Sequence, residues 1–129
     1  MKVIIAAAGT AGHINPGLSI ANTIKKNDPT AQIIFVGTKR GLENDLVPRA
    51  GYELKTIEAY GITLSNTTKA FKILKGYKQA KSIIKEFKPD IVIGTGGYIC
   101  GPVLTEASKM NIPTMLHESN AFPGKAVKF

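Results

Sequence analysis

A histidine at the end of a run of small residues is the first place where this sequence could do chemistry. Residues 8–13 read Ala-Gly-Thr-Ala-Gly-His and directly follow an apolar run. Small residues let a ligand approach the backbone closely, and a helix starting there would offer unpaired N–H groups and the positive end of its dipole. The segment therefore suits a phosphate or diphosphate, although a plain tight turn would look the same. His13 could act as a general base, donate to a phosphate, or pack against the start of its own helix.

A second glycine-rich segment, residues 94–102, reads Gly-Thr-Gly-Gly-Tyr-Ile-Cys-Gly-Pro. It would present further backbone N–H groups ahead of a helix that starts at a proline. Tyr98 could stack on a ligand or pack beneath the loop. Cys100 is the only cysteine, which excludes an intrachain disulfide, and we interpret it as a small buried side chain.

Polar residues also follow the last apolar run, where residues 117–120 read His-Glu-Ser-Asn. Glu118 and His117 could form an acid/base pair or fix the loop, and Asn120 could bind a ligand or cap a turn. The sequence has neither a cluster of metal-ligating residues nor the dinucleotide pattern G-x-G-x-x-G. We therefore expect no metal and no cofactor.

Short apolar runs alternate with helical patterns along the chain, which predicts an α/β fold with a Rossmann-like parallel sheet flanked by helices. Asn15 is the expected N-cap of the first helix, with Pro16 at its first position. The expected strand order is 3-2-1-4-5, which would bring the three polar segments to one crevice at the carboxyl ends of the strands. Strands are expected at residues 2–8, 32–37, 52–57, 90–94 and 112–117, and helices at residues 16–26, 42–50, 68–87 and 102–110.

The third predicted helix is unusually basic within a chain of net charge +8. Seven lysines and one acidic residue lie in residues 69–88, and an apolar stripe that includes Phe71, Leu74, Ala80 and Ile84 is expected to face the core. A solvated helix face would explain the lysines, but the near absence of acids favours docking on an anionic membrane. A nucleic-acid partner is not expected, because no stacking platform or binding motif is present. The residues expected to dock are Ile62, Leu64, Lys69, Lys72 and Lys75.

The length of 129 residues fits one globular domain, and 43% of the residues are hydrophobic. No run approaches the roughly 20 apolar residues that a membrane-spanning helix needs. We interpret residues 1–129 as a single domain that is truncated at its C-terminal end.

The three polar segments, in this order, resemble those of the MurG family, whose members transfer N-acetylglucosamine to a lipid-linked cell-wall precursor. The family's G-G-T-G-G-H is matched by residues 8–13 with alanine at Ala8 and Ala11. Its G-x-G-G-Y-x-x-G-P is matched in full by residues 94–102. Its H-E-Q-N is matched by residues 117–120, with Ser119 in place of glutamine.

This resemblance implies the N-terminal, acceptor-binding domain of a GT-B glycosyltransferase, with the donor-binding domain absent. The implied reaction transfers N-acetylglucosamine from UDP-N-acetylglucosamine to lipid I at the cytoplasmic face of the bacterial membrane, on which the protein would be peripheral. His13 is the implied catalytic residue. The residues implied in substrate binding are Thr10, Ala11, Gly12, Gly96, Gly97, Tyr98, Glu118 and Asn120.

Two other functions fit the same residues. The chain could be a non-catalytic module that docks on the membrane, binds the acceptor and recruits a separate donor-binding subunit. It could also belong to a glycosyltransferase that acts on diacylglycerol, which binding to a diphosphate lipid but not to a neutral glycerolipid would argue against.

Overall fold

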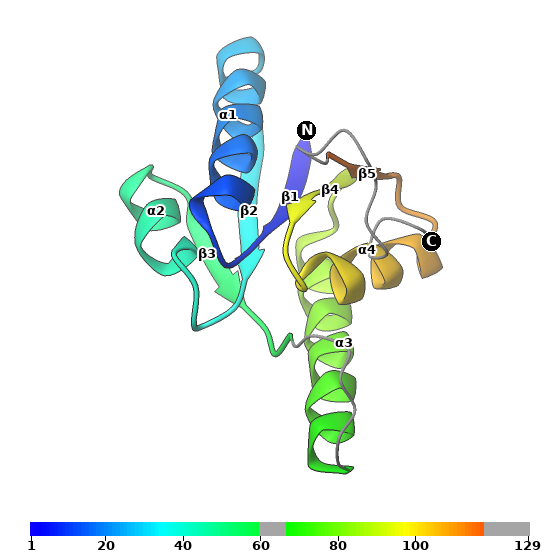
Figure 1. Ribbon diagram of the computed structural model, residues 1–129. Coiled ribbons are helices and arrows are strands. Elements are labelled where there is room, and N and C mark those ends of the chain that lie inside the picture. The colour runs from blue at the N-terminus through cyan, green and yellow to red at the C-terminus, as the bar shows by residue number, and fades with distance from the viewer. Residues whose placement is uncertain (60–66, 118–129) are drawn as a thin grey trace.

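A five-stranded parallel sheet forms the centre of the molecule, with the strand order β3-β2-β1-β4-β5 (Figure 1). The computed structural model describes residues 1–59 and 67–117, with the backbone alone described for residues 67–70. The predicted fold class and strand order are confirmed. The strands are β1 (Lys2–Ala7), β2 (Gln32–Gly37), β3 (Glu53–Thr56), β4 (Ile91–Gly96) and β5 (Thr114–Leu116).

The helices cover both faces of this sheet. Helices α1 (Ala11–Asn27) and α2 (Glu43–Arg49) lie on one face, while α3 (Thr67–Phe87) and α4 (Cys100–Lys109) lie on the other (Figure 1). Each face of the sheet has its own hydrophobic core, and successive β1 side chains point into alternate cores. Ile5 packs on the α1 side and Ile4 on the α3 side. Both side chains are fully buried, as expected for the central strand of a parallel sheet covered on both faces.

Helix α1 starts five residues earlier than predicted, so the expected N-cap at Asn15 is wrong. The helix begins at Ala11 with Thr10 as its N-cap, and Pro16 lies inside it. Pro16 has no N–H with which to close the helical bond to the carbonyl of Gly12. The helix tolerates this loss near its start. As a result, Gly12 and His13 belong to the first helical turn rather than to a loop.

Helix α3 departs from prediction in the face that it presents to the core. Ala80 and Ile84 are buried as expected, but the side chains of Phe71 and Leu74 are 73% and 59% exposed. Close packing starts at Gly76, where an added Cβ would lie 1.8 Å from the carbonyl oxygen of Glu58. The first turns of α3 extend beyond the sheet (Figure 1), which accounts for the exposure of Phe71 and Leu74.

Candidate functional site

The first two predicted segments meet where β1 and β4 end. The N–H of Ala8 donates to the carbonyl oxygen of Gly96 over 3.2 Å, which joins the two glycine-rich loops directly. The pairing of β1 with β4 shifts register between Ala6 and Ala7, so that Ala7 lies opposite Gly96 and Thr95 is the extra residue. The predicted meeting of the first two polar segments is therefore confirmed for the described residues.

His13 is held beside the two glycine loops by contacts of its ring and of its backbone. Its Nδ1 lies 3.0 Å from the carbonyl oxygen of Ala8. A carbonyl only accepts, so this contact places the proton on Nδ1 and, in the neutral ring, leaves the lone pair on Nε2. The Thr95 hydroxyl donates to the carbonyl oxygen of His13 over 2.7 Å and fixes the backbone as well. A neutral His13 is thus in the tautomer that a general base requires at Nε2.

The ring of His13 packs directly on the second glycine loop. A Cβ on Gly96 would lie 2.3 Å from Cδ2 of His13, and Gly96 has a φ of +135°, which side-chain-bearing residues rarely adopt. Gly97 follows with a φ of +98° and is half-buried. Gly96 therefore makes room for the imidazole ring, whereas a Cβ on Gly97 would lie 2.7 Å from the carbonyl oxygen of Ala8.

The start of α1 is open to a ligand. The side chain of its N-cap, Thr10, makes no capping hydrogen bond, and the first turn contains no acidic residue. Thr10 and Gly12 are exposed, and Ala11 is half-buried. The first N–H groups of a helix have no partner within it, and they lie at the positive end of its dipole. These residues can therefore accommodate an anionic group beside His13.

Tyr98 is exposed, whereas Cys100 is buried. The side chain of Tyr98 is 68% exposed, so it does not pack beneath the loop and is available to a ligand. Cys100 is buried, as predicted, and its Sγ lies 3.7 Å from the carbonyl oxygen of Ala6. It begins α4, which starts two residues before the predicted Pro102.

The remaining predicted residues cannot all be placed. Glu118 and Asn120, with Ile62 and Leu64, lie outside the described residues. The backbone of His117 donates to the carbonyl oxygen of Gly94 over 2.8 Å, and its side chain is exposed. On α3, Lys72 and Lys75 are exposed, whereas Lys69 lies in the stretch whose side chains are not described.

One buried polar residue of this region was missed by sequence reasoning. Glu43, the first residue of α2, is fully buried and accepts a hydrogen bond from the N–H of Gly9 over 3.0 Å. An acid at a helix start is unremarkable, because it complements the helix dipole. The signal that could have identified it is the pair of nearby glycines, Gly37 and Gly41, whose missing side chains make room for its carboxylate.

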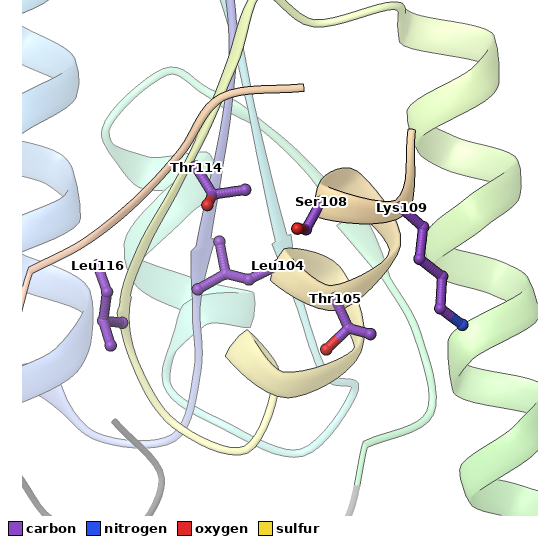
Figure 2. Close-up of a pocket in the computed structure, with 6 residues that line it drawn as sticks. All are labelled: Leu104, Thr105, Ser108, Lys109, Thr114 and Leu116. Carbon is purple, nitrogen blue, oxygen red and sulfur yellow. The ribbon is translucent and has the colours of Figure 1, made fainter. Parts of the chain in front are cut away.

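A shallow pocket of about 300 Å³ lies elsewhere, between α4 and β5 (Figure 2). None of its lining residues belongs to the predicted site, and the glycine loops do not contribute to it. Its lining offers hydroxyl groups and one lysine but no group suited to acid/base chemistry. We therefore place the candidate site at the glycine loops rather than in this pocket. The lining residues are Leu104, Thr105, Ser108, Lys109, Thr114 and Leu116.

Within residues 1–59 and 67–117, no group of three or more His, Cys, Asp or Glu side chains is arranged to hold a metal ion. No helix in the same part of the chain is both long and apolar enough to cross a membrane.

Comparison with known proteins agrees with this geometry. The chain is 55% identical over 128 residues to the UDP-N-acetylglucosamine–N-acetylmuramyl-(pentapeptide) pyrophosphoryl-undecaprenol N-acetylglucosamine transferase of Acetivibrio thermocellus, and 56% identical to that of Thermoanaerobacter sp.. Each match covers 96% of this chain and 35% of the relative. The crystal structure of MurG from Acinetobacter baumannii is similar with a TM-score of 0.82 and 32% identity, over 95% of this chain and 36% of that one.

These matches confirm the resemblance to MurG, and with it the assignment of the sheet to the GT-B fold. The chain spans about a third of the length of the curated relatives that it matches. The model of the glycosyltransferase family 28 N-terminal domain matches residues 3–129, which is nearly the whole sequence. The chain therefore belongs to glycosyltransferase family 28.

Proposed function

We propose that this chain forms the acceptor-binding part of an enzyme that transfers N-acetylglucosamine from UDP-N-acetylglucosamine to lipid I, giving lipid II for peptidoglycan synthesis. The relatives named above carry this activity in their names. The observation that carries the proposal for this chain is the position of His13, whose Nε2 is left with its lone pair beside the open N-terminus of α1.

The transfer requires one base and a site for charged phosphates. The hydroxyl oxygen of lipid I attacks the anomeric carbon of the donor sugar, and the bond from that carbon to UDP breaks. In the proposal, Nε2 of His13 takes the hydroxyl proton, while UDP leaves with the bonding electrons. Backbone N–H groups at Thr10, Ala11 and Gly12 stabilise diphosphate charge, because they point outward from the helix start.

The second glycine loop supplies three further residues of the proposed site. Tyr98 offers an exposed ring and hydroxyl at the rim, and Gly96 and Gly97 keep the second loop close to the first. Glu118 and Asn120 enter the proposal through the resemblance to MurG alone.

The outer face of α3 supports docking on an anionic membrane surface. Phe71 and Leu74 are exposed on the same side of the helix as Lys75 and Lys78, because residues three, four and seven apart share a helix face. Lysines near an anionic surface contribute about 1 kcal/mol each, and the apolar side chains add burial in the headgroup region. We propose the cytoplasmic face of the cell membrane as the location, since lipid I would be met there.

The proposed reaction is tested by incubating the full-length protein with UDP-N-acetylglucosamine and a soluble lipid I analogue. Mass spectrometry should detect the disaccharide product and UDP in equal amounts. A full-length protein that binds the analogue but forms no product would contradict the proposal and favour the non-catalytic, acceptor-binding module. Binding of diacylglycerol in preference to the diphosphate lipid would favour the related glycolipid enzyme.

Membrane docking is tested separately by sedimentation with vesicles of phosphatidylglycerol and phosphatidylcholine. The double variant Phe71→Ser/Leu74→Ser should bind these vesicles more weakly than the wild type, and added salt should weaken both. The matched control is Met115→Ser, which also removes an exposed apolar side chain but lies on β5. Equal vesicle binding by the double variant and the wild type would contradict docking through this face.

A further inference from the structure

Glu43 is a buried carboxylate that the proposed chemistry does not use. Its side chain is fully buried, and its two oxygens accept three hydrogen bonds. Oε2 accepts from the N–H of Thr38 over 2.7 Å and from the hydroxyl of Thr38 over 3.0 Å. Oε1 accepts from the N–H of Gly9 over 3.0 Å. Burying a carboxylate is costly unless its oxygens are hydrogen-bonded in this way, so the surroundings are organised around it.

The carboxylate of Glu43 occupies the space that a side chain at Gly41 would need. A Cβ on Gly41 would lie 1.9 Å from Oε1 of Glu43 and 2.7 Å from the backbone nitrogen of Gly9. Contacts this short are not tolerated by real side chains, so Gly41 permits the loop after β2 to close over the carboxylate. The same loop therefore touches Glu43 and Gly9 at one point.

What Glu43 holds is the first glycine loop. Both backbone polar groups of Gly9 are bound by the segment at the start of α2, since its N–H donates to Glu43 and its carbonyl accepts from the N–H of Leu42 over 3.1 Å. Gly9 has a φ of +96°, so it makes the turn from β1 towards α1. The next residues, from Thr10 to His13, are the candidate ligand-binding residues and the candidate base.

We propose that Glu43 is a positioning residue for the sugar transfer, acting through Gly9 on the start of α1 and on His13. The inference rests on the proposed function. A site whose donors are fixed before the substrate arrives does not have to reorganise during the reaction, which is the main source of electrostatic catalysis. A displacement of roughly 1 Å in such a site can cost about 100-fold in rate.

Three donors converge on Glu43, and this explains why a carboxylate is needed. Two carboxylate oxygens accept all three bonds, whereas glutamine offers one oxygen and one NH2 group. In Glu43→Gln the NH2 group would face either Gly9 or Thr38, each of which also donates, so one side of the network must move apart. The variant keeps the size of the side chain and changes only its hydrogen bonding.

The test compares Glu43→Gln with Glu106→Gln in the full-length protein. Glu106 is a matched control because it is also a buried carboxylate, but it lies on α4 and pairs with Lys109 at 3.2 Å. We expect Glu43→Gln to lower kcat about 10- to 100-fold, with a much smaller change in KM for the acceptor. Glu106→Gln should lower the melting temperature while leaving kcat unchanged. Equal kcat for Glu43→Gln and the wild type would overturn the positioning role.

A second pair of variants separates displacement of Glu43 from loss of its charge. Gly41→Ala leaves the carboxylate chemically unaltered but crowds both its Oε1 and the backbone nitrogen of Gly9, so it should reproduce the fall in kcat. The double variant Gly41→Ala/Glu43→Gln should be no slower than the slower single variant, because both changes release the same loop. Losses that multiply in the double variant would overturn the route through Gly9.

An NMR measurement keeps this inference distinct from the proposed function. In protein labelled with 15N-glycine, Glu43→Gln should shift the amide resonance of Gly9, while that of Gly101, which lies on α4 at the other face of the sheet, should not move. If the wild type transfers no sugar, the proposed function is overturned, and the Gly9 resonance alone decides whether Glu43 holds the loop. An unshifted Gly9 resonance overturns the inference even when the enzyme is active.

Discussion

The glycine loops and the first turns of α3 are the two regions that we propose contact ligands, and they differ in how firmly their residues are held. At the loops, His13 is bound through its ring and its backbone, and Gly9 is bound through its N–H and its carbonyl. On α3, by contrast, Phe71 and Leu74 are left largely in water. Chemistry requires groups held to a fraction of an ångström, whereas docking on a fluid surface requires only accessible apolar area and charge.

The largest effect should come from removing the candidate base. We expect His13→Ala to lower kcat by about 10²- to 10⁴-fold, the range that a positioned general base contributes. The unfolding free energy should change little, because the ring is only partly buried. Steady-state kinetics of the full-length protein, with a melting curve beside them, test this. Near-normal turnover would mean that the fixed geometry around His13 serves packing rather than catalysis.

The second prediction separates two effects of Gly96 on turnover, its close contact with the ring of His13 and its backbone conformation. Gly96→Ala places a methyl group 2.3 Å from the ring of His13, so we expect turnover to fall about 100-fold. Gly51→Ala is the matched control, since its φ of +91° is also one that side-chain-bearing residues rarely adopt, but nothing lies within 4 Å of the added Cβ. Gly51→Ala should lower stability by about 1 kcal/mol and leave turnover unchanged.

The comparison would fail if both glycine variants lost turnover to the same extent. Global destabilisation would then explain the loss, and the contact with His13 would not be needed. Measuring kcat well below the melting temperature of each variant separates the two causes.

The third prediction contrasts two positions of the same helix. Ile84→Ala removes a fully packed side chain and should lower the free energy of unfolding by about 2–4 kcal/mol. Leu74→Ala removes an exposed side chain and should change it by less than about 0.5 kcal/mol. Urea denaturation measures both. A large loss at Leu74 would show that the first turns of α3 are packed after all and would weaken the docking proposal.

The fold could be predicted from the sequence because its strands are short apolar runs separated by helical patterns. Those runs form the central strands β1, β2 and β4, where burial on both faces leaves little choice of residue. The packed length of α3 could not be assigned in the same way, because an apolar pattern that includes Phe71 and Leu74 does not show where packing begins. Close packing begins at Gly76, and that contact depends on the path of the segment that contains Glu58.

The residues proposed for the site stand out in the sequence, but the contacts between them do not. The glycine loops and His13 stand out by composition, and their meeting follows from the strand order. The start of α1 was misplaced because Pro16 and Asn15 look like a helix start, while the true N-cap, Thr10, lies within the glycine loop. The neighbouring glycines Gly37 and Gly41 are the only sequence hint of the buried Glu43, and they do not reveal its three donors, which come from residues 9 and 38.

The smallest effect should come from a single hydrogen bond that joins the two loops. Thr95 is buried, and Thr95→Val keeps its shape but removes the hydroxyl that donates to the carbonyl oxygen of His13. We expect the free energy of unfolding to fall by about 1 kcal/mol, the usual value of one such bond, and kcat to fall a few-fold. Thr95→Ser retains the hydroxyl and loses only a methyl group, so it should preserve kcat. If Thr95→Ser and Thr95→Val lower kcat equally, packing at this position sets the loop, and the hydrogen bond to His13 does not.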